Sequence, residues 1–315
     1  MSCLLGDVGG TRTRFALFAD GQVGPIESLR TGAYASMHDA AHHFLNGQPE
    51  GTVVDRAVIA AAGPVSGGRC KLTNAAWTLD AESLRQSLHL RSVRLVNDLE
   101  ALAWAVPHFG ANDVVAVGEG SAVMGEPVAV IAPGTGLGLA CYLPGAAPRA
   151  VASEAGHATL AASDAGDAAI HEVLRRRFGH VSAERVLSGA GLVNLHAVLA
   201  VQDGHAPGTP TPEEIVRGAL SGTAPRYAAA LELFCGFLGS FAGDMALTFA
   251  ARGGVLIGGG IAPHIVPVLR DSSFRKRFAA KGRFAGYVGQ IPTGIIVRLE
   301  PTFLGLAALA ARGDG

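Results

Sequence analysis

The sequence predicts an α/β fold in two halves, each of which opens with apolar strands around a glycine-rich turn. The first glycine turn, near the start of the chain, is Gly6-Asp7-Val8-Gly9-Gly10-Thr11. The second glycine turn, in the middle of the chain, is Gly134-Thr135-Gly136. Glycine allows positive φ and leaves no side chain between backbone N–H groups and an anion. Two such turns indicate two half-folds that hold one polyphosphate from opposite sides, so a nucleotide-using enzyme is the leading hypothesis.

Composition narrows the class of protein. The chain has 315 residues, of which 49% are hydrophobic, so we expect two domains with a sizeable core. A net charge of −1 argues against nucleic-acid and membrane partners. The four cysteines are scattered without a CxxC pair, which argues against disulfides and a cysteine zinc site. Because Asp7 interrupts the apolar start, we expect no signal peptide and a soluble cytoplasmic protein.

The first half alternates strands and helices. Apolar runs and turn residues predict strands at 4–8, 13–19, 26–31, 56–62 and 93–96. Helical spacing predicts helices at 37–45, 80–88 and 98–106, of which the second begins after Asp80 as N-cap. Residues 107–112 are predicted to be the linker between the two halves.

The second half repeats this order and so indicates an internal duplication. Strands are predicted at 114–117, 128–132, 137–142, 255–257 and 295–299. Helices are predicted at 165–178, 183–187, 191–201, 212–220, 225–252, 261–269 and 303–311.

The helix predicted at 225–252 is apolar on most faces and carries Gly236, Gly239 and Gly243. We interpret it as a buried central helix packed closely on a neighbour. A membrane helix is the alternative, but Glu232 and Asp244 leave too short an apolar run.

The first glycine turn has the composition of a phosphate cradle. Thr11 can donate to a phosphate oxygen, and Asp7 can hold Mg²⁺ through water. The turn is not a P-loop, since no Gly-Lys-Ser/Thr follows, and it is not a dinucleotide fingerprint, since a strand follows it. An ordinary glycine hairpin is the alternative.

Two further glycine segments extend this interpretation. The second glycine turn has the same chemistry, with a tight hairpin as its alternative. A third glycine turn, Gly258-Gly259-Gly260, joins a predicted strand to a predicted helix, whose N-terminus offers N–H groups and a positive dipole end. We assign the third turn to the adenosine side of a nucleotide. A tight strand-to-helix connection is the alternative.

Polar residues outside the turns are candidates for the chemistry. Asp98 lies where a predicted strand ends and a helix begins, so it is either a general base that accepts a hydroxyl proton or a helix N-cap. Glu154 and His157 have di-iron spacing, but no second Glu-x-x-His accompanies them. They are better interpreted as polar groups that hold a polyol. Glu184 is a third such group or a solvated helix residue.

These pieces occur in one order along nearly the whole chain. Three further motifs belong to this order: Leu72-Thr73-Asn74 with Trp77, Asn97 before Asp98, and Glu184-Arg185-Val186-Leu187-Ser188-Gly189. The combination resembles the bacterial glucokinase family of the enterobacterial type, within the actin/hexokinase-like superfamily. The resemblance implies two actin-like (ribonuclease H-like) α/β lobes with an interlobe cleft. The small lobe would be 1–107 plus the C-terminal helix 300–315, and the large lobe 108–299.

The resemblance also implies the roles of the residues. Asp98 would be the base on the sugar 6-hydroxyl, and the other hydroxyls would be held by Asn97, Glu154, His157 and Glu184. The ATP phosphates, with Mg²⁺, would lie between the glycine turns, and the enzyme would be a homodimer. Two departures stand out: Arg12 follows Thr11 where the family usually has Asn, and the zinc motif of the related repressor/open-reading-frame/kinase family is absent.

The expected activity is therefore ATP-dependent phosphorylation of glucose to glucose 6-phosphate. A kinase for another hexose or an amino sugar is the nearest alternative, and a panel of hexoses separates the two. A catalytically silent sugar-sensing regulator would bind glucose without phosphate transfer. A chaperone-like or filament-forming ATPase would hydrolyse ATP without sugar.

Overall fold

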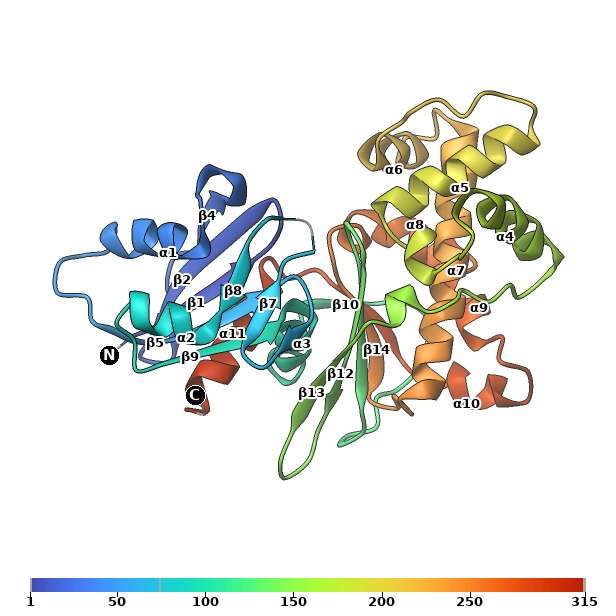
Figure 1. Cartoon of the computed structure of the whole chain (residues 1–315). Helices are drawn as coiled ribbons and strands as arrows, with labels where there is room; N and C mark the ends of the chain where they lie inside the picture. The colour runs from blue at the N-terminus through green and yellow to red at the C-terminus, as the bar shows by residue number, and fades with distance from the viewer. Residues whose placement is uncertain (1, 74, 314–315) are drawn as a thin grey trace. The chain divides into compact units, whose positions relative to one another are not determined.

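The computed structural model describes residues 2–73 and 75–313 and divides the chain into two compact units. The first unit is the chain up to Phe109 together with the chain from Leu299 onward, and the second unit is Gly110–Arg298 (Figure 1). The first change of unit falls inside the predicted linker. Asn74, part of the motif quoted above, and the last two residues of the predicted C-terminal helix lie outside the described residues.

The main sheet of the first unit has the order β3-β2-β1-β5-β9, with β4 also on β2. Its strands are β1 (Ser2–Val8), β2 (Arg12–Ala19), β3 (Gln22–Val23), β4 (Glu27–Arg30), β5 (Val54–Ala61) and β9 (Ser92–Asn97). β1 is antiparallel to β2 and parallel to β5, which is parallel to β9. A small second sheet contains β6 (Val65–Ser66), β7 (Arg69–Lys71) and β8 (Thr78–Asp80).

The sheet of the second unit has the order β10-β15-β14-β11-β12-β13. Its strands are β10 (Val114–Ala116), β11 (Val128–Pro133), β12 (Leu137–Leu143), β13 (Arg149–Ser153), β14 (Gly254–Ile257) and β15 (Thr293–Ile296). β11 is antiparallel to β12 and parallel to β14, which is parallel to β15. This is the pattern of β2, β1, β5 and β9 again, so the predicted duplication is confirmed at the level of topology.

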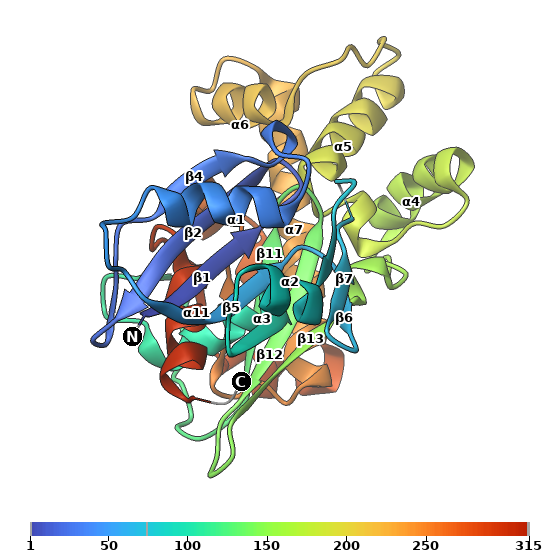
Figure 2. The same cartoon turned by 60° about the vertical axis from the view of Figure 1, so that its left-hand side comes forward.

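Helices cover both faces of the first sheet. They are α1 (Met37–Asn46), α2 (Ala81–Ser87), α3 (Asp98–Ala105) and α11 (Pro301–Ala311). The residues of α1 and α2 pack on the face that carries Leu4, Val8 and Phe15 (Figure 2). The carboxylate of Asp80 accepts the N–H of Ser83 at 2.9 Å, which confirms the predicted N-cap of α2.

The C-terminal helix α11 packs on α3, β1 and β5. At Gly305 the two helices are so close that a Cβ atom would lie 1.7 Å from the carbonyl oxygen of Ala101 in α3. Only glycine allows this backbone-to-backbone contact. The position of α3, which begins at Asp98, therefore depends on α11.

Seven helices are described in the second unit. They are α4 (Ala165–Phe178), α5 (Gly189–Gln202), α6 (Pro212–Leu220), α7 (Pro225–Thr248), α8 (Val266–Asp271), α9 (Phe274–Ala279) and α10 (Ala285–Gly289). Cβ atoms at Gly239 and Gly243 would lie 2.2 Å from Phe274 O and 2.3 Å from Phe278 O. The close packing predicted for α7 is confirmed, and its neighbour is α9. By length and composition α7 passes for a membrane span, but 72% of its most apolar window is buried within the protein, as in a core helix.

A buried ion pair joins α4 to α9. Both nitrogens of the Arg277 guanidinium fork donate to the two carboxylate oxygens of Asp167, Nη1 at 3.1 Å. The Asp167 side chain is only 2% exposed, and Arg277 also lies over the ring of Phe237 in α7. The pair therefore ties three helices together in a place where an unpaired charge would be costly.

Several sequence predictions of secondary structure were wrong. The helix expected at 183–187 is a 3-10 turn, Ala183–Arg185, and the one expected at 261–269 is the 3-10 turn Ala262–Ile265 followed by α8. The strand expected at 295–299 is β15, which begins and ends earlier. Seven further elements were not predicted from the sequence: β3, β6, β7, β8, β13, α9 and α10. These are short, so their apolar periodicity covers too few residues to be recognised.

Candidate functional site

The first glycine turn closes the β1–β2 hairpin. The N–H of Gly9 donates to the carbonyl of Arg12 at 3.0 Å, and a Cβ at Gly9 would lie 3.0 Å from that same oxygen. Neither Gly9 nor Gly10 has a positive φ. Close approach to the Arg12 carbonyl, and not a left-handed backbone, therefore favours glycine at position 9. Among the described residues, the N–H groups of Gly10 and Thr11 have no backbone partner and are available to an anion.

Gly6 and Val8, which the sequence analysis counted with the cradle, lie inside β1. Both are buried and pair with β2 and β5 on either side. A Cβ at Gly6 would lie 2.7 Å from the side chain of Ile59. The structure therefore gives both residues a packing role, and the part of the turn accessible to a ligand begins at Gly9.

Asp7 belongs to a three-residue charge network. The guanidinium of Arg14, directly opposite Asp7 on β2, donates to Asp7 Oδ2 at 3.1 Å and pairs through Nε with Glu300 Oε1 at 3.2 Å. Burial raises the pKa of the Asp7 carboxyl, and the charge of Arg14 opposes this rise. Glu300 precedes α11 with φ +48°, a left-handed conformation that is unfavourable for a residue with a side chain.

The second and third glycine turns adjoin one another in the second unit. Gly134 donates its N–H to Gly136 O at 2.8 Å, and its Cβ position is 3.8 Å from the nitrogen of Gly260. Gly259 has φ +78°, and a Cβ there would lie 2.4 Å from Pro133 O. Thr135, at the tip of the second turn, is exposed.

The chain after the third turn differs from the prediction. It forms the four-residue 3-10 turn Ala262–Ile265, and not the long helix that was expected. The macrodipole of so short a segment is small, so an anion there would depend on backbone N–H groups rather than on a helix dipole.

Glu184 supports the second glycine turn. Its Oε2 accepts the N–H of Leu137 at 3.0 Å, and a Cβ at Gly136 would lie 2.5 Å from that same oxygen. The N–H of Gly189 donates to Gly134 O at 2.8 Å, so residues 184–189 hold the second glycine turn at both of its ends. Glu184 is thus half-buried and bonded, unlike a solvated surface glutamate.

Glu154 and His157 lie beside the same turn. Glu154 precedes the 3-10 turn Ala155–His157, and His157 is its last residue. Gly156 of this turn is packed so closely on the second glycine turn that a Cβ would lie 2.1 Å from Leu137 O. Glu154 Oε2 and His157 Nε2 are 4.0 Å apart, and both side chains are exposed. The 3-10 turn that follows Glu154 and contains His157 packs on β12, which begins at Leu137, and on the 3-10 turn that contains Glu184. The three predicted residues of the second unit therefore lie in neighbouring segments.

Asn97 and Asp98 divide two tasks at the start of α3. Asn97 Oδ1 caps the helix by accepting the N–H groups of Leu99 and Glu100, and Asn97 Nδ2 donates to Gly63 O at 3.0 Å. The alternative that Asp98 is the N-cap is therefore wrong, because Asn97 occupies that position. Asn97 keeps only one amide hydrogen for a sugar.

The half-buried Asp98 is the first residue of α3. Its Oδ1 accepts the N–H of Leu99 at 2.9 Å. The pKa of the Cys70 thiol in β7 is raised first by burial and then by the negative charge of Asp98, so the Asp98 carboxylate lies near β7. The N-terminus of a helix favours an anion, so this position stabilises the ionised form that a base needs.

Three contributors to the site were not predicted from the sequence: Arg14, Leu137 and Glu300. If the first glycine turn is taken as the tip of a β-hairpin, the antiparallel register on either side of it places Arg14 opposite Asp7. Nothing in the sequence brings Glu300 to them, because the approach of α11 is a tertiary contact.

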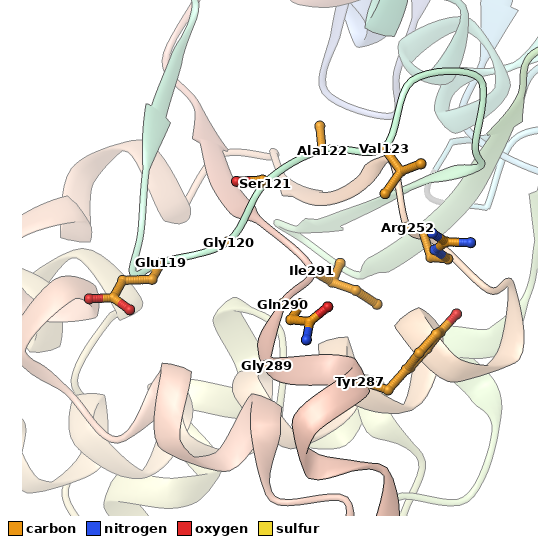
Figure 3. Close-up of a pocket in the computed structure, with 10 residues that line it drawn as sticks. All are labelled: Glu119, Gly120, Ser121, Ala122, Val123, Arg252, Tyr287, Gly289, Gln290 and Ile291. Carbon is orange, nitrogen blue, oxygen red and sulfur yellow. The ribbon is translucent and has the colours of Figure 1, made fainter.

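A hollow in the second unit is lined by none of the predicted site residues. It measures about 480 Å³ and is lined by residues 119–123, 252, 287 and 289–291. Figure 3 shows Arg252 and Tyr287 at one end of it and Glu119 at the other. Arg275 stiffens its wall by donating to the carbonyls of Glu119, Gly289 and Ile291.

Comparison with known proteins agrees with this architecture. The family model described as Glucokinase matches residues 4–313. A glucokinase of Nitrobacter hamburgensis is 40% identical over 307 residues, which are 97% of this chain and 96% of that protein. The crystal structure of a glucokinase from an Antarctic psychrotroph matches with a TM-score of 0.88 at 34% identity, covering 99% of each chain.

A ROK family glucokinase from Streptomyces griseus, solved with glucose and AMPPNP, matches with a TM-score of 0.69 at 22% identity. It covers 99% of this chain and 100% of its own, and it indicates a shared fold alone. The duplicated α/β units and their glycine turns thus define a sugar kinase with two actin-like lobes. More particularly, the chain belongs to the glucokinase family, as the sequence resemblance implied.

Proposed function

We propose that this enzyme transfers the terminal phosphoryl group of ATP to the 6-hydroxyl of glucose, with Asp98 as the general base. The observation that carries the role of Asp98 is the division of labour at α3. Because Asn97 caps the helix, the Asp98 carboxylate is not needed for that purpose. Membership of the glucokinase family supports the reaction, and the Streptomyces griseus protein was solved with glucose and an ATP analogue.

In the proposed reaction, the sugar hydroxyl attacks the γ-phosphorus in line, and Asp98 accepts its proton late in the transfer. Glu154, His157 and Glu184 would hold the remaining hydroxyls, together with the one spare amide hydrogen of Asn97. Glu184 has one oxygen on Leu137 N, so its other oxygen would face the sugar.

The glycine turns would hold the donor. N–H groups of Gly10 and Thr11, the Thr11 hydroxyl, and the backbone of Thr135 and Gly260 are the proposed phosphate and nucleotide contacts. They would balance the negative charge that spreads over the phosphoryl oxygens during transfer.

Mg²⁺ is part of the proposal, with Asp7 as the residue that holds it through water. Only Oδ2 of Asp7 is bonded to Arg14, which leaves Oδ1 for a hydration water. No group of three metal-binding side chains forms among residues 2–73 and 75–313. This donor set fits a hydrated Mg²⁺ that the phosphates, more than the protein, hold in place. When bound, the ion would neutralise phosphate charge.

The test is ATP consumption with and without glucose, in an assay coupled to oxidation of the sugar phosphate. We expect glucose-dependent turnover, and Asp98→Asn is expected to keep the fold and glucose binding while losing nearly all turnover. Asp39→Asn, in the first turn of α1, is the control and is expected to retain activity. Full activity of Asp98→Asn would refute the role of Asp98. ATP hydrolysis without sugar, or glucose binding without transfer, would refute the reaction, and a hexose panel tests the sugar.

The homodimer, the cytoplasmic location and the absence of nucleic-acid and membrane partners stay predictions from the sequence. Light scattering during size-exclusion chromatography tests the first. A monomer at assay concentration would overturn it.

A further inference from the structure

Beside the first glycine turn, the first unit contains a hollow of about 510 Å³. It is lined by Gly10, Thr11, Arg12, Arg30, Gly32 and Ala33. All six residues come from the β1–β2 turn, the end of β4 and the 3-10 turn Thr31–Ala33. The hollow therefore adjoins the N–H groups proposed to hold phosphate.

Two arginines of this hollow oppose one another. Arg12 and Arg30 are direct partners in the antiparallel β2–β4 pair, and both are exposed. Like charges directly opposite each other across two strands are destabilising. Arg12 Nη1 donates to the hydroxyl of Ser28 at 3.4 Å. Within the described part of the chain, neither guanidinium has a carboxylate partner. Asp7, the acidic residue beside the turn, is already paired with Arg14.

The walls of the hollow are fixed by hydrogen bonds to the turn. Thr31 donates its hydroxyl to Gly9 O at 2.8 Å and its N–H to Thr11 O at 3.1 Å. The residues that line the hollow include two arginines, and among the described residues the N–H groups of Gly10 and Thr11 have no backbone partner. The Thr11 hydroxyl can donate as well. A lining with two guanidinium groups that lack a carboxylate partner in the described part of the chain is complementary to a multivalent oxyanion.

We propose that Arg12 and Arg30 form an anion subsite that continues the first glycine turn and binds a phosphate of the phosphoryl donor. The inference rests on the proposed function for the identity of the donor. The ligand class is a polyphosphate chain, whose adjacent phosphates can contact the turn and the arginine pair together. The like-charge repulsion between the two strands is relieved when the anion binds.

Direct binding tests the subsite without any turnover. The probe is inorganic tripolyphosphate, titrated calorimetrically into the full chain at low salt, without glucose. We expect Arg12→Gln and Arg30→Gln each to weaken its binding about fivefold or more, and added salt to shrink the difference. The matched control is Arg91→Gln, an exposed arginine of the same unit whose side chain is 73% exposed, and it is expected to bind like the parent.

Two further measurements separate a binding role from a structural one. Since removal of one arginine relieves the repulsion, Arg30→Gln is expected to melt at the same or a higher temperature than the parent, but to gain less from tripolyphosphate. In kinetics, KM for MgATP is expected to rise while KM for glucose stays unchanged. Arg30→Lys is expected to recover part of the lost affinity, because charge is kept but the planar fork is not.

Three outcomes would overturn the subsite: equal tripolyphosphate affinity in the parent and the double variant, equal loss in Arg91→Gln, or an unchanged KM for MgATP in an active double variant. Failure of the proposed function is a separate result. If the chain does not phosphorylate glucose but tripolyphosphate binding still depends on both arginines, the subsite stands and the reaction falls.

Discussion

Replacement of Gly305 by alanine tests whether the packing of α11 on α3 positions the proposed base. The added Cβ would lie 1.7 Å from Ala101 O, 2.8 Å from Ala101 C and 3.0 Å from Ala105 N. All three are backbone atoms of α3, so no side-chain rotation relieves the contact. Ordinary van der Waals contact begins at 3.4 Å, so the two helices would have to separate.

The magnitude follows from two opposing effects. Overpacking a core costs about 1–3 kcal/mol, and a clash between two backbones belongs at the upper end. Alanine returns about 1 kcal/mol of helix propensity relative to glycine. We therefore expect the free energy of unfolding of the first unit to fall by about 2 kcal/mol. Because α3 begins at Asp98, and a shift of about 1 Å can cost about 100-fold in rate, kcat is expected to fall about 10- to 100-fold.

Urea unfolding followed by tryptophan fluorescence measures the stability change, since Trp77 and Trp104 both lie in the first unit. The coupled kinase assay measures kcat. The control is Gly286→Ala in α10, where a Cβ would meet nothing within 4 Å. It carries the same gain in helix propensity without the clash, so it is expected not to lower the free energy of unfolding and to leave kcat unchanged. If Gly305→Ala unfolds and turns over like the parent, the account of the α3–α11 contact is refuted.

Three more predictions concern the second unit. Asp167→Asn leaves Arg277 buried without its counter-charge and is expected to lower the free energy of unfolding by about 3 kcal/mol, as measured by urea titration; an unchanged midpoint would contradict this. Glu184→Gln keeps an oxygen that can accept the N–H of Leu137 but loses the charge that strengthens this hydrogen bond. KM for glucose and KM for MgATP are therefore both expected to rise severalfold. A rise in KM for glucose alone would mean that the hydrogen bond to the glycine turn is unimportant. Burial raises the pKa of the Cys235 thiol from 9.0 to about 12. The unfolded chain therefore loses this proton at a lower pH than the folded chain. The contribution of the neutral thiol to the free energy of unfolding is fully present below pH 9 and is lost as the pH rises from 9 toward 12. A thiol reagent is expected to modify the buried cysteines only after unfolding.

Much of the fold follows from local pattern. The predicted helices at 165–178 and 212–220 coincide with α4 and α6, and the long strands β1, β2, β5, β11 and β12 were located to within a few residues. Each of these elements has enough apolar periodicity to dominate its own conformation. Short elements such as β13 and α9 escaped, because a few residues are stabilised by their neighbours in space rather than by their own pattern.

The reasons for particular glycines also differ from what the sequence suggested. We expected positive φ to explain the glycine turns, but among their residues only Gly259 has one. At Gly136 the absence of a side chain leaves room for the Glu184 carboxylate, whose Oε2 would lie 2.5 Å from a Cβ at this position. That reason involves a residue far away in the chain, and no local pattern contains it.

By itself, the sequence determined the α/β class, the duplicated order, the glycine turns and the family, since periodicity, turn chemistry and motif order depend on neighbours in the chain. The tertiary structure alone decided the contacts that give those residues their roles: Arg14 between Asp7 and Glu300, Glu184 on Leu137, and Arg12 opposite Arg30. Such contacts depend on strand register and on helix packing. A shift of one residue in register turns a side chain to the other face of its sheet, so chemistry at a distance is fixed only once the chain has folded.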